Sequence, residues 1–224
     1  MPPDGSPEGR RAMPRDDRST SMDLIFFNEL EAQTVEAVAA RIIPGDATDP
    51  GAREANVVTY IDRSLAGFLR DLQTFYRRAL QELDDYSRDR HNGLFRELTE
   101  GDQDRVLAEL DTVSTIETVC REYGTDALQD ENKEGDESVS TLLIRFFSII
   151  REHVLQGMFC DPAYGGNRDT VGWKMVGFPG AQWGYSAEQM KPGFDASQIP
   201  VLTLQDLHQR YSRTDRNNGT EGSR

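Results

Sequence analysis

The centre of the fold is encoded by residues 139–158, which read VSTLLIRFFSIIREHVLQGM. Apolar side chains occupy nearly every side of the helix that these residues would form: Leu142, Leu143, Ile144, Phe146, Phe147, Ile149, Ile150, Val154 and Leu155. A helix that is apolar nearly all round is buried among other elements. The segment therefore predicts a central helix, and the neighbouring segments should supply the helices that cover it.

Amphipathic segments before this helix have the pattern expected of its covering layer. Asn28 and Glu31 have the spacing of a capping box at a helix start, and Pro44-Gly45 ends that helix. Its apolar positions recur at near-helical spacing and indicate a core face: Leu30, Val35, Val38 and Ile42. The helical period resumes at Val57, Tyr60, Ile61, Leu65 and Phe68.

Further amphipathic segments complete the predicted bundle. Residues 69–86 place these side chains on one stripe: Leu72, Phe75, Tyr76, Ala79, Leu80 and Leu83. Thr99 and Asp102 indicate another helix start, and a short helix is expected near residues 202–211. No segment shows the sustained alternation of a sheet. The sequence thus predicts an all-α fold, an irregular helical bundle with a long loop rich in glycine and aromatic residues after the central helix.

Three segments lie outside this pattern. Residues 1–21 are rich in Pro, Gly, Ser, Arg and Asp without apolar periodicity, and they predict a disordered leader. Residues 125–138 are dominated by acidic side chains, so we expect an exposed, mobile loop there. Residues 212–224 are polar and predict a disordered tail. The 224-residue chain is interpreted as a single helical domain, residues 22–211, with two tails.

The charge balance excludes some classes of partner. The chain has 25 Lys and Arg against 39 Asp and Glu, which gives a formal net charge of -14. A surface of this sign does not attract a phosphate backbone or an anionic membrane, so nucleic acid is not an expected partner. No apolar run approaches the roughly 20 residues that a membrane-spanning helix needs, and no membrane span is predicted.

The cysteines and histidines give no sign of a catalytic or metal site. Cys120 and Cys160 cannot form a zinc site by themselves, and no histidine lies at a ligand spacing beside either. The two cysteines allow one disulfide in an oxidising compartment, or two buried thiols in a reducing one. The histidines lie in three separate predicted elements, and none is beside a Ser or Cys in a nucleophile motif: His91, His153 and His208. His153 is interpreted as a core or interface residue.

Helical packing does not explain residues 161–186. Within them, residues 161–180 combine five glycines with two prolines and several aromatic side chains. This composition favours an irregular backbone that displays large side chains and packs on another surface. A long irregular segment in a compact domain is usually functional, so we interpret it as a docking surface for another protein. The residues assigned to that surface are Tyr164, Gly165, Gly166, Asn167, Arg168, Trp173, Phe178, Pro179 and Trp183.

Two alternatives apply to the same segment. The aromatic residues Trp173, Phe178, Trp183 and Tyr185 could instead form a satellite core under a long loop. Residues 165–168, Gly-Gly-Asn-Arg, would suit a phosphate group, but a phosphate loop follows a strand and precedes a helix, whereas here a helix precedes and more glycine follows. The sequence therefore favours a structural or interface turn over a phosphate site.

Two separated motifs resemble those of one family. Residues 161–169, Asp-Pro-Ala-Tyr-Gly-Gly-Asn-Arg-Asp, followed by Gly172-Trp173 and Gly177-Phe178-Pro179-Gly180, are similar to the signature of the gluconate 2-dehydrogenase subunit 3 family. The amino-terminal helix and turn of that family are resembled by Phe26-Phe27-Asn28-Glu29, residues 34–44, Gly51-Ala52 and Tyr60-Ile61-Asp62. The resemblance spans about residues 24–186.

The resemblance implies a non-catalytic small subunit of a bacterial FAD-dependent sugar or polyol dehydrogenase complex. In such complexes a large subunit of the glucose-methanol-choline type carries FAD and the catalytic base, and a cytochrome subunit can be added. The small subunit would support folding, flavin uptake or export of the large one, so no cofactor is expected in this chain. The alternatives are a transient assembly chaperone and a self-sufficient hydrolase that uses His153 with Asp161 or Asp169.

The leader bears on the compartment. Arg10-Arg11 is similar to the start of a twin-arginine export signal, but residues 12–18 contain no apolar region. The sequence as it stands predicts a cytoplasmic protein. The alternative is a periplasmic protein that is exported with its partner.

Overall fold

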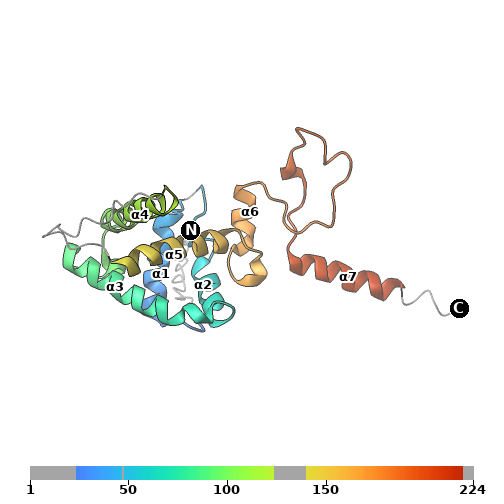
Figure 1. The fold of residues 1–224 in the computed structure, drawn as a ribbon. Coiled ribbons are helices and arrows are strands. Elements are labelled where there is room, and N and C mark those ends of the chain that lie inside the picture. Colours follow the sequence, from blue (N-terminus) through green and yellow to red (C-terminus); the bar gives the residue numbers. More distant parts are fainter. Residues whose placement is uncertain (1–23, 47, 124–139, 219–224) are drawn as a thin grey trace, which may run out of the picture.

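The computed structural model describes residues 24–46, 48–123 and 140–218. In order, the helices are α1 (Glu29–Ile42), α2 (Val57–Ala66), α3 (Gln73–His91), α4 (Glu100–Tyr123), α5 (Thr141–Phe159), α6 (Val171–Met175) and α7 (Leu204–Asn218) (Figure 1). No strand occurs within these ranges, so the predicted all-α class is confirmed. The predicted leader and the predicted acidic loop lie outside the described residues.

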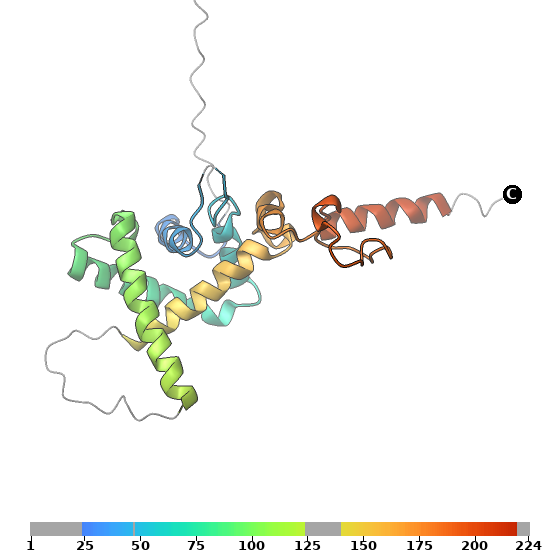
Figure 2. The ribbon, with the colours of Figure 1, turned by 90° about the horizontal axis from the view of Figure 1, so that it is seen from above.

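Helix α5 is the centre of the bundle, as the sequence predicts. Helices α1 to α4 all pack on it, and Figure 2 shows it running through the bundle with α4 crossing it. The hydroxyl of Ser140 caps its start by accepting a hydrogen bond from Leu143 N at 3.2 Å. The side chains that α5 buries form much of the core: Leu143, Ile144, Phe146, Phe147, Ile150, Val154 and Met158.

Helix α1 begins with the predicted capping box. Asn28 Oδ1 accepts a hydrogen bond from Glu31 N at 2.9 Å, and Glu31 Oε2 accepts one from Asn28 N at 2.9 Å. Val35 is fully buried, as predicted, but Leu30 is 55% exposed. The prediction of a core position for Leu30 was wrong because Phe27, directly before the cap, is buried and fills the core at this end of the helix.

A buried carboxylate joins the amino-terminal segment to α2. Asp62 is fully buried, and it accepts hydrogen bonds from the N–H groups of Ile25, Phe26 and Phe27 at 2.7, 3.0 and 2.8 Å. These donors compensate the cost of burying the carboxylate. Two parts of the amino-terminal motif that are distant in the sequence are therefore in direct contact.

Helices α2 and α3 bury most of the predicted apolar residues, but the chain between the two helices differs from the prediction. Helix α2 ends at Ala66, and Phe68, which was expected on its apolar face, is 72% exposed. This expectation was wrong because the chain leaves the helix at Gly67. A 3-10 turn at Arg70–Leu72 then precedes α3, which buries the predicted residues Tyr76, Ala79, Leu80 and Leu83.

Helix α4 starts where the sequence predicts a start. Thr99 lies before it, and its hydroxyl accepts a hydrogen bond from Asp102 N at 3.2 Å. The helix buries Val106, Leu107 and Leu110. It then continues without a break to Tyr123, so residues 113–120 extend this helix and do not begin another.

Helix α7 extends away from the bundle (Figures 1 and 2). The chain returns toward the bundle before it, through an isolated parallel bridge between Gly180 and Leu202. The helix expected near residues 202–211 runs from Leu204 to Asn218. Residues 212–218, predicted to be disordered, are therefore helical. No Gly or Pro interrupts the chain before Gly219, so the helix can continue that far.

Candidate functional site

Residues 161–180, called the cap segment below, close the carboxyl end of α5. The last carbonyl groups of a helix have no partner within it. Asn167 donates to two carbonyls here, its N–H to Gly157 O at 2.8 Å and its Nδ2 to Cys160 O at 2.8 Å. The indole Nε1 of Trp173 donates to Phe159 O at 2.7 Å. The surface on which this irregular segment packs is thus the end of the central helix.

Two glycines let the cap segment touch the backbone of α5. A Cβ atom on Gly166 would lie 2.2 Å from Gly157 O. A Cβ atom on Gly172 would lie 2.1 Å from Met158 O. Side-chain carbons do not approach an oxygen this closely, so the contact requires glycine at both positions. Gly172 N also donates to Asn167 Oδ1 at 2.8 Å, which ties the two halves of the segment together.

The backbone between these glycines is strained. Asn167, Asp169 and Thr170 have φ values of 44°, 55° and 57°, in the left-handed region. Asn and Asp tolerate this conformation, whereas the β-branched Thr170 does not adopt it easily. Thr170 N donates to Asn167 O at 2.9 Å, and Asn167 is fully buried. A single asparagine therefore holds both the strained turn and the end of α5.

Most backbone N–H groups of this turn already donate to carbonyl groups of the same chain, so few remain to bind an anion. The N–H groups of Gly165, Arg168 and Thr170 donate to Pro162 O, Ala55 O and Asn167 O at 3.0, 3.0 and 2.9 Å. A phosphate cradle needs such groups pointing at the ligand. The geometry agrees with the interpretation of residues 165–168 as a structural turn.

The predicted docking residues fall into two groups. Those buried within the chain are Gly166, Asn167, Trp173 and Pro179. These four residues hold the cap segment against its own chain, and a role for them in docking stays a prediction. Those exposed or partly exposed are Tyr164, Gly165, Arg168, Phe178 and Trp183. For these residues the docking role stays a prediction. The satellite-core alternative is correct for Trp173, which is 5% exposed.

Exposed apolar side chains from α5 and from the cap segment form a patch at the carboxyl end of α5. This end patch consists of Leu155, Phe159, Val176 and Phe178, with exposures between 37% and 59%. A hollow of about 320 Å³ lies among Phe159, Val176, Phe178 and the Trp173 ring. Trp173 meets Phe178 edge to face, with ring centroids 5.3 Å apart. The end patch is therefore an apolar surface with a shallow hollow at its centre.

Sequence reasoning missed most of the end patch. Leu155 was placed among the core residues of the central helix, and Phe159 and Val176 were not singled out. Leu155 and Phe159 lie four residues apart and share one face of α5, away from the buried Val154 and Met158. The four-residue spacing could have predicted a shared exposed face. It was not noticed because the helix is apolar on nearly every other side as well.

The comparison with known families covers both the helical bundle and the cap segment. The family model for gluconate 2-dehydrogenase subunit 3 matches residues 29–180, from the first residue of α1 to the end of the cap segment. The chain belongs to the gluconate 2-dehydrogenase subunit 3 family. Neither a curated protein nor a solved structure gives a significant match. In this subunit 3 chain, residues 181–218 lie beyond the family match.

His153 of this subunit 3 protein is a core residue, as predicted. Its Nδ1 lies 2.6 Å from the hydroxyl oxygen of Tyr76, and the two rings are stacked with centroids 5.9 Å apart. Burial lowers the pKa of His153 and raises the pKa of Tyr76, so both side chains favour their neutral forms. A hydrogen bond joins His153 Nδ1 to the Tyr76 hydroxyl, and the tautomer of the imidazole ring decides which of the two donates.

The rival hydrolase assignment finds no support in these contacts. Asp161 accepts hydrogen bonds from Ala163 N at 2.9 Å and Leu204 N at 2.8 Å, so its carboxylate serves the turn and the start of α7. Asp169 is exposed, and its carbonyl accepts from Lys174 Nζ at 2.7 Å. The ring of His153 forms its hydrogen bond with Tyr76, and these contacts of the two aspartates do not involve it.

The remaining predicted features have different outcomes. Cys160 forms no disulfide with any described residue, and burial raises the pKa of its thiol. The side chain of Cys120 lies outside the described part of the chain, so the disulfide stays a prediction. Within the described ranges, no group of three or more His, Cys, Asp or Glu side chains could hold a metal ion. No helix among the same residues is long and apolar enough to cross a membrane.

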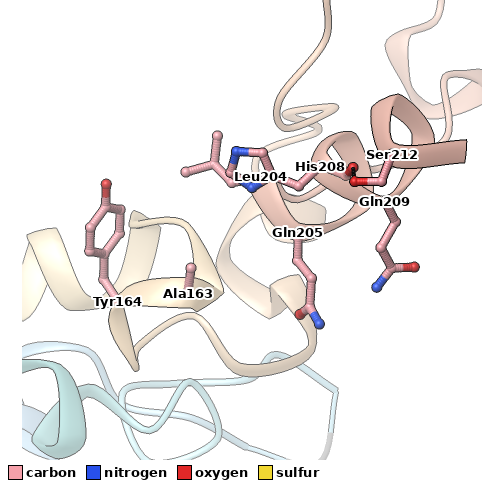
Figure 3. A pocket seen from close by; sticks show the side chains of 7 residues that line it. All are labelled: Ala163, Tyr164, Leu204, Gln205, His208, Gln209 and Ser212. Carbon is pink, nitrogen blue, oxygen red and sulfur yellow. Dashed lines mark hydrogen bonds between the residues drawn. The ribbon is translucent and has the colours of Figure 1, made fainter. Parts of the chain in front are cut away.

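A larger hollow lies between the turn at Pro162–Tyr164 and the start of α7 (Figure 3). Its volume is about 680 Å³. The lining residues are Ala163, Tyr164, Leu204, Gln205, His208, Gln209 and Ser212. This lining contains no carboxylate, thiol, Lys or Arg, and the hydroxyl of Ser212 donates to the backbone carbonyl of His208 at 2.9 Å.

Proposed function

We propose that this chain is the small, non-catalytic subunit of a FAD-dependent sugar or polyol dehydrogenase complex. In this role it binds a flavin-bearing large subunit of the glucose-methanol-choline type and supports the folding or maturation of that subunit. Membership of the gluconate 2-dehydrogenase subunit 3 family is the observation that carries the proposal. The FAD and the catalytic base belong to the large subunit, and a cytochrome subunit can complete the complex.

The end patch supports a role in protein binding. Its members include side chains 59% and 46% exposed, at Val176 and Phe178. Contiguous exposed apolar side chains on a soluble protein commonly mark an interaction surface. Hydrogen bonds from the cap segment to α5 hold this patch in one arrangement, so little ordering is required when a partner binds.

Co-expression tests the proposal. The chain is produced alone and together with a candidate large subunit, a flavin-dependent dehydrogenase encoded beside it. Alone, it should show no flavin absorbance and no turnover of sugars. Together, the two chains should co-elute in size-exclusion chromatography as a complex that contains flavin. Separate elution, with a large subunit that folds and binds FAD equally well without this chain, would refute the proposal.

The same preparation separates a permanent subunit from a transient chaperone. A subunit remains in the mature, flavin-loaded complex in a fixed ratio to the large chain. A chaperone raises the yield of active dehydrogenase but is absent from the purified enzyme. Quantitative gel analysis of the flavin-containing fraction distinguishes these outcomes.

A further inference from the structure

Three exposed cations gather where α2 meets the cap segment. Arg63 belongs to α2, and Arg168 and Lys174 belong to the cap segment. These three residues are called the basic junction below. We propose that the basic junction binds carboxylates on the surface of the flavin-bearing large subunit. This inference rests on the proposed function and adds the face of this chain that makes the contact and the chemistry of its partner.

Hydrogen bonds join the two parts of the chain that carry these cations. Arg168 N donates to Ala55 O at 3.0 Å, and Asn56 Nδ2 donates to Gly165 O at 3.5 Å. Ala55 and Asn56 lie directly before α2, so the turn at residues 165–169 is attached to the start of that helix. Cations that are far apart in the sequence are thereby brought to one face of the molecule.

Each end of the turn at residues 165–169 contacts one of the other two cations. A Cβ atom on Gly165 would lie 3.0 Å from Arg63 Cδ and 3.1 Å from Arg63 Nη1, so the absence of a side chain there leaves room for the guanidinium. At the other end of the turn, Lys174 Nζ donates to Asp169 O at 2.7 Å. Arg63, Arg168 and Lys174 therefore all lie along this one turn.

The backbone of the turn is strained beside Arg168. The next two residues, Asp169 and Thr170, have φ values of 55° and 57°. Strain of this kind persists only where the surrounding structure enforces it, and it is concentrated at binding and active sites. A turn held in one conformation also loses little conformational entropy when a partner binds. Both properties support a binding role for this turn.

The charge of the basic junction is opposite to that of the whole chain. The chain has a net charge of -14, yet the turn at residues 165–169 contributes one carboxylate, Asp169, beside the three cations. The adjoining turn before α2 adds Arg53 and Glu54, whose charges cancel. Among the described residues, none of the three cations has a carboxylate within ion-pair distance. Carboxylates on a partner would complement them without first breaking an ion pair.

Other sources of negative charge fit this face less well. A nucleic acid or an anionic membrane presents many phosphates, and the net charge of -14 repels both. A second copy of the chain would bring two net charges of -14 together, and the same repulsion opposes that association. The family match over residues 29–180 includes the whole basic junction. The partner proposed for this family, the large subunit, is therefore the better candidate to supply the carboxylates.

Two double variants with the same net charge test the proposal. Arg63→Glu/Arg168→Glu reverses both arginines of the basic junction, and Arg70→Glu/Arg78→Glu reverses two exposed arginines elsewhere. Lys174 is left unchanged because its hydrogen bond to Asp169 O also supports the turn. After circular dichroism confirms the helical fold, the dissociation constant of each variant from the large subunit is measured at low salt. We expect the first variant to bind about tenfold more weakly than the wild type, and the second to change by less than about threefold.

Salt separates an ionic contact from a change in shape. Added salt screens exposed charges, so the tenfold loss should shrink to less than about threefold near 1 M salt. The neutral variant Arg63→Gln/Arg168→Gln removes the attraction without adding repulsion, and it should weaken binding at low salt less than the charge reversal does. If the loss caused by Arg63→Glu/Arg168→Glu is the same at low and high salt, the contact is not ionic and the inference is overturned.

The outcomes separate this inference from the function on which it rests. If the wild-type chain does not bind the large subunit at all, the proposed function fails. If the wild type binds and the two charge-reversed variants bind equally well, the function stands and the basic junction is not part of the interface. If the wild-type chain alone is a dimer that Arg63→Glu/Arg168→Glu dissociates, a second copy supplies the carboxylates and the inference is overturned.

Discussion

Residues 161–180 and residues 181–203 have similar compositions but different contacts. Both combine glycine and proline with large aromatic residues. In the first stretch Trp173 is 5% exposed and donates a hydrogen bond to the end of α5. In the second stretch Trp183 is 73% exposed. The family match includes the first stretch and ends before the second.

The difference comes from what each stretch can reach. The cap segment directly follows α5 and meets carbonyl groups that have no partner within the helix, so its polar groups have fixed acceptors. The second stretch follows the cap segment and not a helix, and its backbone pairs with that segment through the bridge between Leu202 and Gly180. A composition rich in glycine and aromatic residues therefore does not by itself distinguish a helix cap from an exposed loop.

The two tryptophans give the largest contrast. Trp173→Ala removes a buried indole, its packing on Phe178 and its hydrogen bond to Phe159 O. We expect the free energy of unfolding to fall by about 4 kcal/mol, as for other buried aromatic residues. Trp183→Ala, at a largely exposed position, should lower it by less than about 1 kcal/mol. Urea unfolding followed by circular dichroism measures both values. Similar losses of unfolding free energy would show that the two stretches contribute equally to the stability of the fold.

The glycines give the next contrast. Gly172→Ala places a Cβ atom 2.1 Å from Met158 O, so the cap segment must move off the helix. The free energy of unfolding should fall by about 3 kcal/mol, at the upper end for overpacking. Gly184→Ala meets no atom within 4 Å and should leave stability unchanged or raise it by about 0.5 kcal/mol. Thermal melts of the two variants check this, and a tolerated Gly172→Ala would mean that the contact with α5 is loose.

Local signals in the sequence were sufficient to predict much of the fold. The capping box of Asn28 and Glu31 and the apolar segment of α5 each depend on residues that are close in sequence, and both were confirmed. The exposure of Leu30 was not predictable from the helical period, because it depends on Phe27 occupying the core beside it. Apolar periodicity therefore predicts that a helix forms more reliably than it predicts which apolar residues at the end of that helix are buried.

The candidate site was harder to predict because its contacts join separate elements. The composition of the segment singled it out, but the role of Trp173 depends on a carbonyl 14 residues earlier that only the folded chain brings beside it. Gly166 and Gly172 were taken as shaping a displayed loop, whereas each permits a backbone contact with α5. The end patch was missed because Leu155 belongs to a helix that is apolar on nearly every side.

The smallest expected effect is on the pH dependence of stability, and it comes from His153 of α5, inside the bundle and away from the capped end of the helix. Burial lowers the pKa of His153 from its ordinary value of 6.5, although Glu152 partly opposes this. The folded state therefore binds fewer protons than the unfolded state at slightly acidic pH. The stability contributed by neutral His153 is complete above about pH 6.5 and falls as the pH is lowered toward the folded-state pKa, by at most about 1.4 kcal/mol per pH unit.

A non-titrating variant isolates this contribution from that of the carboxylates. His153→Gln should be less stable than the wild type at pH 8, because the contact with Tyr76 changes, but its stability should fall less between pH 7 and pH 5. His208→Gln, at an exposed position on α7, should keep the wild-type pH dependence. Chemical unfolding at several pH values gives the three curves. If His153→Gln and the wild type run parallel, His153 is protonated without cost, and the hydrogen bond to Tyr76 does not require the neutral ring. If they converge as the pH falls, the stability of α5 depends on a neutral His153 inside the bundle as well as on the cap at its end.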